Sequence, residues 1–102
     1  MQNRRLRIAV GTGTMVAGTC AIVWKDPDTI DAGSPTTIEL EYAPTFRFVQ
    51  REGAYGGAGG VAANAGDLTI TAVTVNGCTV TSSNAADTGG VRVTAIVRGA
   101  DF

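Results

Sequence analysis

The chain of 102 residues contains no histidine, one lysine and three leucines. The absence of histidine excludes imidazole acid–base catalysis and histidine-ligated metal sites. The scarcity of leucine argues against amphipathic helices built on leucine stripes. Charged residues make up 17% of the chain, against about a quarter in typical soluble domains, and the net charge is −1. No overall field therefore draws the protein to nucleic acid or to an anionic membrane.

So little charge is unusual for the surface of a free monomer. Partner proteins could cover part of that surface, or it could be a polar surface rich in threonine and serine, and the composition favours neither explanation. The length predicts one domain, 1–102, whose core is too small for a sizeable interior active-site cavity.

Two further shortages concern cysteine and targeting signals. The two cysteines, Cys20 and Cys78, allow one disulfide, but both lie in apolar stretches where free buried cysteine is common, so we expect reduced thiols. The first 24 residues have a basic start and a weakly apolar run, as a secretory signal has, but glycines and threonines interrupt the run. It is also too polar for a membrane-spanning helix. We therefore expect a product of the cytoplasm without a targeting segment.

The residues that are abundant favour β-structure. Threonine (14), valine (11), glycine (14) and alanine (15) dominate, and the β-branched residues among them fit a pleated surface. The most definite pattern is 67–80, DLTITAVTVNGCTV. It predicts two strands joined by a two-residue type I′ turn at Asn76-Gly77, with a bulge near Thr71-Ala72 where the alternation slips.

Other stretches predict further strands. Alternation places one set of side chains inward in each of four of them: Leu6, Ile8 and Val10; Ile38, Leu40 and Tyr42; Phe46 and Phe48; and Val91, Val93, Ala95 and Val97. The continuous apolar run 20–25 predicts a central strand covered on both faces. Residues 52–66 are glycine-rich and predict a flexible loop, or an arm that orders against a neighbour. About six to eight short strands indicate one antiparallel β-sandwich or small β-barrel, of jelly-roll or immunoglobulin-like type.

No stretch carries a motif for chemistry. The glycines of 11–18 lack the GK[ST] ending of a phosphate loop. Asp26, Asp28 and Asp31 lack the spacing of a calcium loop and suit Asx turns instead. Glu39 and Glu41 share a solvated strand face and do not face each other across a cleft. With no G-x-S-x-G motif either, we expect no enzyme activity, cofactor or metal.

Six residues are candidates for contact with other proteins. Arg5 and Arg7 form a basic strand face and Arg4 precedes them; these three arginines in four residues lack the interleaved aromatics of a nucleic-acid site and suit solvent or an acidic neighbouring protein. Trp24 suits either core packing or an interface anchor. Tyr55 is the one large side chain of the glycine-rich segment, and Phe102 ends the chain. We expect at least one of these three aromatics in a subunit contact.

The stretches TTIELEY, DLTITAVTVNGCTVT and GGVRVTAIVRG resemble in texture the small all-β virion proteins of tailed bacteriophages, above all capsid decoration or cement proteins. The resemblance implies a homo-oligomer in the virion that binds the major capsid protein and other virion proteins, made in the host cytoplasm. It carries over no functional residues. A tail or head–tail connector subunit, or a secreted β-sandwich adhesion module with a disulfide, are the alternatives.

Overall fold

The structure, a computed structural model, describes residues 4–30, 33–52 and 62–101. Its elements are six strands and two 3-10 turns. In chain order these are β1 (Arg4–Thr14), β2 (Thr19–Val23), η1 (Pro27–Thr29), β3 (Phe46–Arg51), η3 (Ala62–Asn64), β4 (Leu68–Thr71), β5 (Gly77–Ser82) and β6 (Gly90–Asp101). The prediction of an all-β chain with about six to eight strands is confirmed, although β1 and β6, of 11 and 12 residues, are not short.

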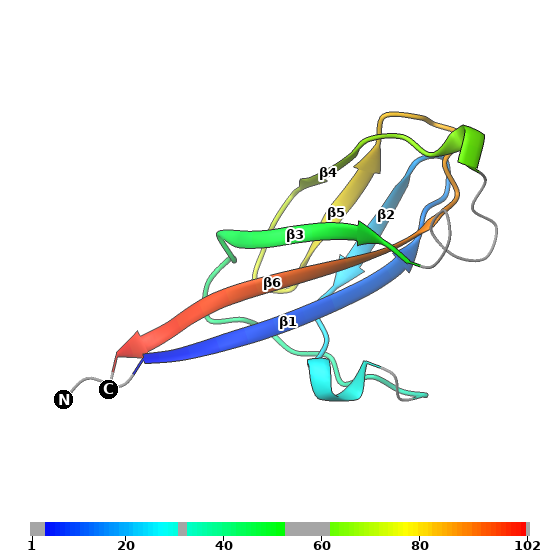
Figure 1. Cartoon of the computed structure of the whole chain (residues 1–102). Coiled ribbons are helices and arrows are strands. Elements are labelled where there is room, and N and C mark those ends of the chain that lie inside the picture. The colour runs from blue at the N-terminus through cyan, green and yellow to red at the C-terminus, as the bar shows by residue number, and fades with distance from the viewer. Residues whose placement is uncertain (1–3, 31–32, 53–61, 102) are drawn as a thin grey trace.

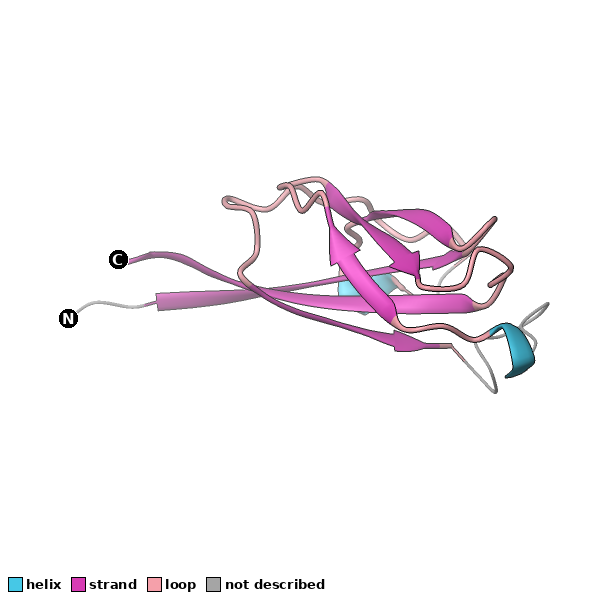
Figure 2. Ribbon diagram, turned by 90° about the horizontal axis from the view of Figure 1, so that it is seen from above, coloured by secondary structure: helices cyan, strands magenta, loops and turns pink. Residues whose placement is uncertain are grey.

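The strands form two antiparallel three-stranded sheets with the orders β1-β6-β3 and β2-β5-β4. β1 and β6 are long and run on together as a two-stranded ribbon beyond the other strands, towards the pole where both termini lie (Figures 1 and 2). The protein is therefore elongated. Its radius of gyration is 14.5 Å, against about 13 Å for a compact chain of this length, and its extents are 53 × 27 × 18 Å.

The core lies between the inner faces of the two sheets. β6 contributes Val91, Val93, Ala95 and Val97, the face predicted from the sequence, and each is at most 5% exposed. The other sheet supplies Ile22, Cys78 and Val80, and the connecting segments add Met15, Trp24 and Leu40. Fully buried Trp24 donates from Nε1 to the carbonyl oxygen of Thr74 at 3.0 Å, so its one polar atom is satisfied inside the core.

The inner face of β1 is built from small residues. Ala9 is fully buried opposite Ala95, and Gly11 and Gly13 follow on the same face opposite Val93 and Val91. A Cβ on Gly11 would collide with the side chain of Ile22, and one on Gly13 would lie 3.2 Å from Cys20 Sγ. The glycines of 11–18 thus allow β1 to approach β2 closely. Ile8 was predicted to point into the core, and that prediction is wrong, because its side chain is 48% exposed.

A tight turn joins β1 to β2. Val16 and Thr19 exchange both backbone hydrogen bonds, at 2.9 and 3.2 Å, and the two residues between them have positive φ, 54° at Ala17 and 77° at Gly18. This is the geometry of a two-residue hairpin loop of type I′. A Cβ on Gly18 would also meet the Asn84 carbonyl oxygen at 2.6 Å, so glycine is required here twice over.

The type I′ turn predicted at Asn76-Gly77 is wrong, although β4 and β5 do pair as neighbours in sequence. Residues 72–76 connect them, Gly77 is already the first residue of β5, and Asn76 has no positive φ. Gly77 is needed because β5 lies against the Ile22 carbonyl of β2, where a Cβ has no room. The irregularity expected near Ala72 is where β4 ends, with a positive φ of 51°.

Two other predicted strands differ from the structure. The run 20–25 was expected to be central, but β2 pairs only with β5 and exposes Val23 by 47%. Residues 36–42 form no regular strand: Thr37 makes a single bridge to Lys25, and Ile38 and Leu40 bond to the carbonyls of Trp24 and Val75. Leu40 is buried as predicted, whereas Tyr42 is 57% exposed. Most of the predicted loop 52–66 lies outside the described residues.

Candidate protein contact surface

The outer face of the β1-β6-β3 sheet carries exposed apolar side chains on both sides of the half-buried Ile96. Across the three strands, Ile8 of β1 lies opposite Ile96 of β6, and Ile96 lies opposite Phe46 of β3. In the next row of the same face, Thr94 of β6 lies between Val10 of β1 and Phe48 of β3. Phe46 is 75% exposed, Phe48 54% and Ile8 48%. We call Ile8, Phe46, Phe48 and Ile96 the apolar face. Phe46 and Phe48 were predicted to point into the core, and that prediction is wrong.

The register with β6 explains this orientation. Val49 lies opposite buried Val93, so Val49 packs against the core and its neighbour Phe48 has to point the other way. The apolar face exposes roughly 300–400 Å² if an aromatic side chain presents about 150–250 Å² in full, which matches the largest patches of monomers, often functional ones.

The apolar face carries little charge. The next row along the strands is Thr12, Arg92 and Gln50, and Arg92 donates from Nε to the Glu52 carboxylate at 3.1 Å. The one cation in these three rows is thus compensated within the chain. On this side of the apolar face, a partner can therefore make contact without leaving an unpaired charge. On the other side, the adjoining row of the same face is Leu6 and Arg98.

The six predicted contact residues do not gather on this face. Trp24 lies wholly in the core, which leaves it no surface for a partner, so the interface role predicted for it is replaced by core packing. Arg7 is exposed on β1. Arg4 and Arg5 begin β1, but their side chains lie outside the described part, and so do Tyr55 and Phe102. The candidate contact residues that sequence reasoning missed are the phenylalanines, which it had assigned to the core.

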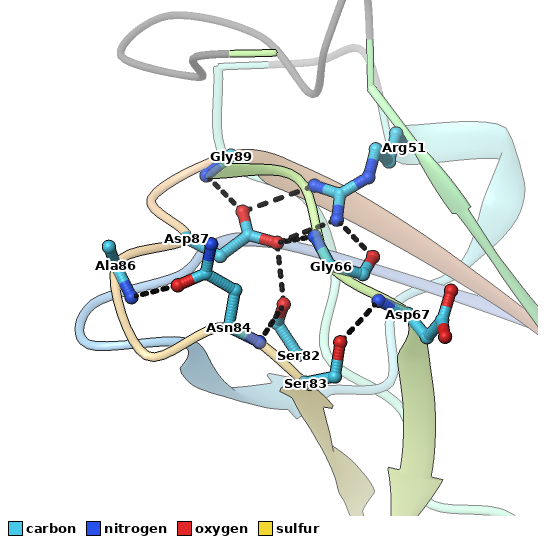
Figure 3. A network of polar contacts seen from close by, with 9 residues as sticks. All are labelled: Arg51, Gly66, Asp67, Ser82, Ser83, Asn84, Ala86, Asp87 and Gly89. Atoms are coloured by element: carbon cyan, nitrogen blue, oxygen red, sulfur yellow. Dashed lines mark hydrogen bonds and ion pairs between the residues drawn. The ribbon is translucent and has the colours of Figure 1, made fainter. Parts of the chain in front are cut away.

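A second feature missed by the sequence reasoning is a buried polar network around Asp87, which is 2% exposed (Figure 3). Its Oδ2 accepts from Arg51 Nη2 at 2.6 Å, Ser82 Oγ at 2.7 Å and the Gly66 amide at 3.0 Å. Its Oδ1 accepts from Arg51 Nη1 at 3.2 Å and the Gly89 amide at 3.1 Å. The network ties β3 of one sheet to β5 of the other and to the loops between them.

The network sets the protonation states of its ion pair. The hydrogen bond from Arg51, helped by those from Gly66, Ser82 and Gly89, holds the pKa of Asp87 well below its usual range despite burial. The same bond raises the pKa of Arg51. Asp87 is saturated with donors from its own chain and is almost inaccessible, so its arrangement serves structure and offers no base to a substrate.

Cys20 and Cys78 are free, and burial raises the pKa of Cys20 and raises that of Cys78 to about 11, with the nearby Cys20 contributing. Among the described residues, no three acidic, cysteine or histidine side chains cluster as metal ligands do. No helix in that part of the chain is long and apolar enough to cross a membrane.

Comparisons with protein-family models, curated proteins and solved structures found no match to this chain.

Proposed function

We propose that the protein is a non-enzymatic structural protein of a virion, and that it attaches to the capsid shell as a decoration or cement protein. The observation that carries the proposal is the apolar face, in which exposed Phe46, Phe48 and Ile8 surround the half-buried Ile96 on the outer side of the sheet. The low charge of the chain and its resemblance in texture to small all-β phage virion proteins support the same function.

The size of the apolar face indicates how attachment works. Covering roughly 300–400 Å² at about 25 cal/mol per Å² stabilises a contact by about 8–10 kcal/mol before association costs of some 4–15 kcal/mol. A standard interface buries about 800 Å² per partner, roughly twice the apolar face. The face can anchor the protein on a shell, but firm attachment needs further contacts or several linked copies.

The experiment uses purified particles of the phage whose genome encodes this chain. Mild denaturant should release this protein while shell and tail stay otherwise intact, and purified chain added back should rebind. The double variant F46S/F48S should rebind at least tenfold more weakly, because the apolar face has lost its two largest side chains.

The matched control is V16S, which removes an equally exposed apolar side chain, 74% exposed, from the β1–β2 turn. It should rebind as the wild type does. Equal rebinding by F46S/F48S and V16S would contradict the proposed docking face. Release only together with the tail would identify a tail or connector subunit, and a disulfide-bonded chain found outside particles would identify an adhesion module.

A further inference from the structure

β1 lies at the edge of its sheet and is held mainly by one other strand (Figure 1). It pairs with β6 in continuous register from Leu6 to Thr14. Outside that ladder, the described residues of β1 make one pair of backbone hydrogen bonds, between Val10 and Lys25 at 3.1 and 2.7 Å. Because it is an edge strand, β1 can leave the sandwich without changing the order of the other five strands.

The turn that joins β1 to β2 is short and strained. Ala17 has a φ of 54°, in the left-handed region that glycine adopts freely and alanine adopts at a cost. Gly18 is fixed to the body of the protein, because its amide donates to the Asp87 carbonyl and its carbonyl accepts from the Ser82 amide. The chain can therefore open at Ala17, which is exposed. Short hinge loops under strain favour the exchange of an element between copies.

We propose that β1 is an exchangeable arm: it leaves its own sandwich at Ala17 and takes the place of β1 in a second copy, which returns its own β1. The structure itself fixes the occupant of the vacated place. A second copy's β1 brings the same small inner residues, Ala9 opposite Ala95 and Gly11 against Ile22, and so makes the same contacts. Exchange of an identical element between protomers is a low-cost route to a dimer.

The turn decides the balance between the closed monomer and the exchanged dimer. Both forms contain the same strand pairs, so these contacts largely cancel in the comparison. The closed form is favoured because its own β1 is tethered beside the site, at an effective concentration of about 1 mM for a short flexible linker. Opening the hinge releases Ala17 from its positive φ and favours the dimer. We therefore expect exchange near about 1 mM chain and little of it at micromolar concentration.

The exchange goes beyond the proposed function and does not depend on it. A dimer formed in this way joins two apolar faces in one molecule, and linked copies are one route to the firm attachment that a single face does not give. The experiments use the isolated chain, so their failure leaves attachment to a shell standing. Rebinding of F46S/F48S to particles, in turn, tests the attachment and not the exchange.

A disulfide between β1 and β6 shows which copy supplies β1. Ile8 and Ile96 lie opposite each other on the outer face. They form a non-bonded pair, because the Met15 amide bonds to the Gly89 carbonyl and bonded pairs alternate along the ladder. Their Cα atoms are then about 4.5 Å apart, within the range that a disulfide spans.

The variant I8C/I96C is refolded from urea in reductant at about 1 mM chain, then oxidised and run on a non-reducing denaturing gel. Exchange places the new disulfides between two chains, so covalent dimers should appear, and refolding at about a hundredfold lower concentration should give mainly monomers. The control I8C alone lacks the partner thiol on β6 and should give markedly fewer dimers. Disulfides that lie within single chains at both concentrations overturn the exchange.

Three alanine variants test the hinge, with dimerisation of the refolded chain measured by sedimentation equilibrium. A17G relieves the strain and should weaken dimerisation at least about tenfold. A17P cannot adopt a positive φ and should strengthen it at least about tenfold. The matched control is A72G, which relieves a φ of 51° at the end of β4, away from the hinge, and should dimerise as the wild type does.

Equal dimerisation by the wild type, A17G and A72G overturns the role of Ala17, and this comparison decides the matter even where A17P does not fold. A dimer whose I8C/I96C disulfides all lie within single chains is a contact between closed surfaces, and it overturns the exchange as well.

Discussion

Replacing Asp87 with alanine tests whether the buried polar network holds the two sheets together. The carboxylate accepts five hydrogen bonds, from Arg51, Ser82, Gly66 and Gly89. Without it, the buried Ser82 hydroxyl and the Gly89 amide lose their acceptor, at about 1–3 kcal/mol for each donor left unsatisfied. The Arg51 side chain is 20% exposed and can rehydrate in part. We therefore expect Asp87→Ala to cost about 3–4 kcal/mol, the lower part of the range for breaking a buried ion pair.

The assay is urea unfolding followed by the emission of Trp24. With an m value of about 1–3 kcal/mol/M, the loss should lower the midpoint by roughly 1–4 M. The control is Asp67→Ala, which removes an exposed carboxylate from the neighbouring loop and should stay within about 0.5 kcal/mol of the wild type. A loss below about 1 kcal/mol for Asp87→Ala would refute the structural role of the network.

Acid tests the same network through the protonation of Asp87. Since the pKa of Asp87 is depressed in the folded state, the unfolded chain binds more protons below the ordinary value of about 3.9. The contribution of Asp87 is complete above that pH and is lost as the pH falls below it. Stability that declines equally in the wild type and in Asp87→Ala between pH 4 and pH 2 would contradict the assignment.

Two further predictions concern the core. Gly77→Ala should destabilise the protein by about 3 kcal/mol or more, because its Cβ meets the backbone of Ile22, whereas Gly33→Ala, where nothing lies within 4 Å, should be nearly neutral in the same urea assay. At pH 8 the thiol of Cys78 should react with a disulfide reagent at least about a hundredfold more slowly in the folded protein than in urea, because burial raises its pKa to about 11. Rapid labelling of the native chain would show that the sandwich opens at Cys78.

The sequence predicted the fold class because composition and alternation are local signals. On β6 the valines alternate with arginine, threonine and isoleucine, so the alternation predicted which face of the strand is buried. On β3 the alternation was also correct, but it left open which of two sets faced the core. Phe46 and Phe48 are larger and more apolar than Val49, so pattern alone favoured them, and only the register with β6 assigns them to the outside.

The turns and the contact features depended on tertiary neighbours. Asn76-Gly77 has the composition of a hairpin turn, yet Gly77 is required because a neighbouring strand lies against it. The type I′ turn of the structure is Ala17-Gly18, and its alanine is a residue that turn propensity would not select. Asp87 lies in a polar stretch that reads as a loop. Its partners Arg51 and Ser82 are distant or uninformative in sequence, so no local signal marks the network.

The pairing of Arg4 with Asp101 brings the first and last described residues together at one pole, with the Asp87 network at the opposite end of the sandwich (Figures 1 and 3). A peptide appended to either terminus would therefore emerge at the same place and leave the body of the protein clear. A short linker could equally join the two ends, so that the ribbon of β1 and β6 becomes a continuous hairpin. New termini could then be opened at the exposed Gly33-Ser34 bend, and an appended peptide would leave the protein from there.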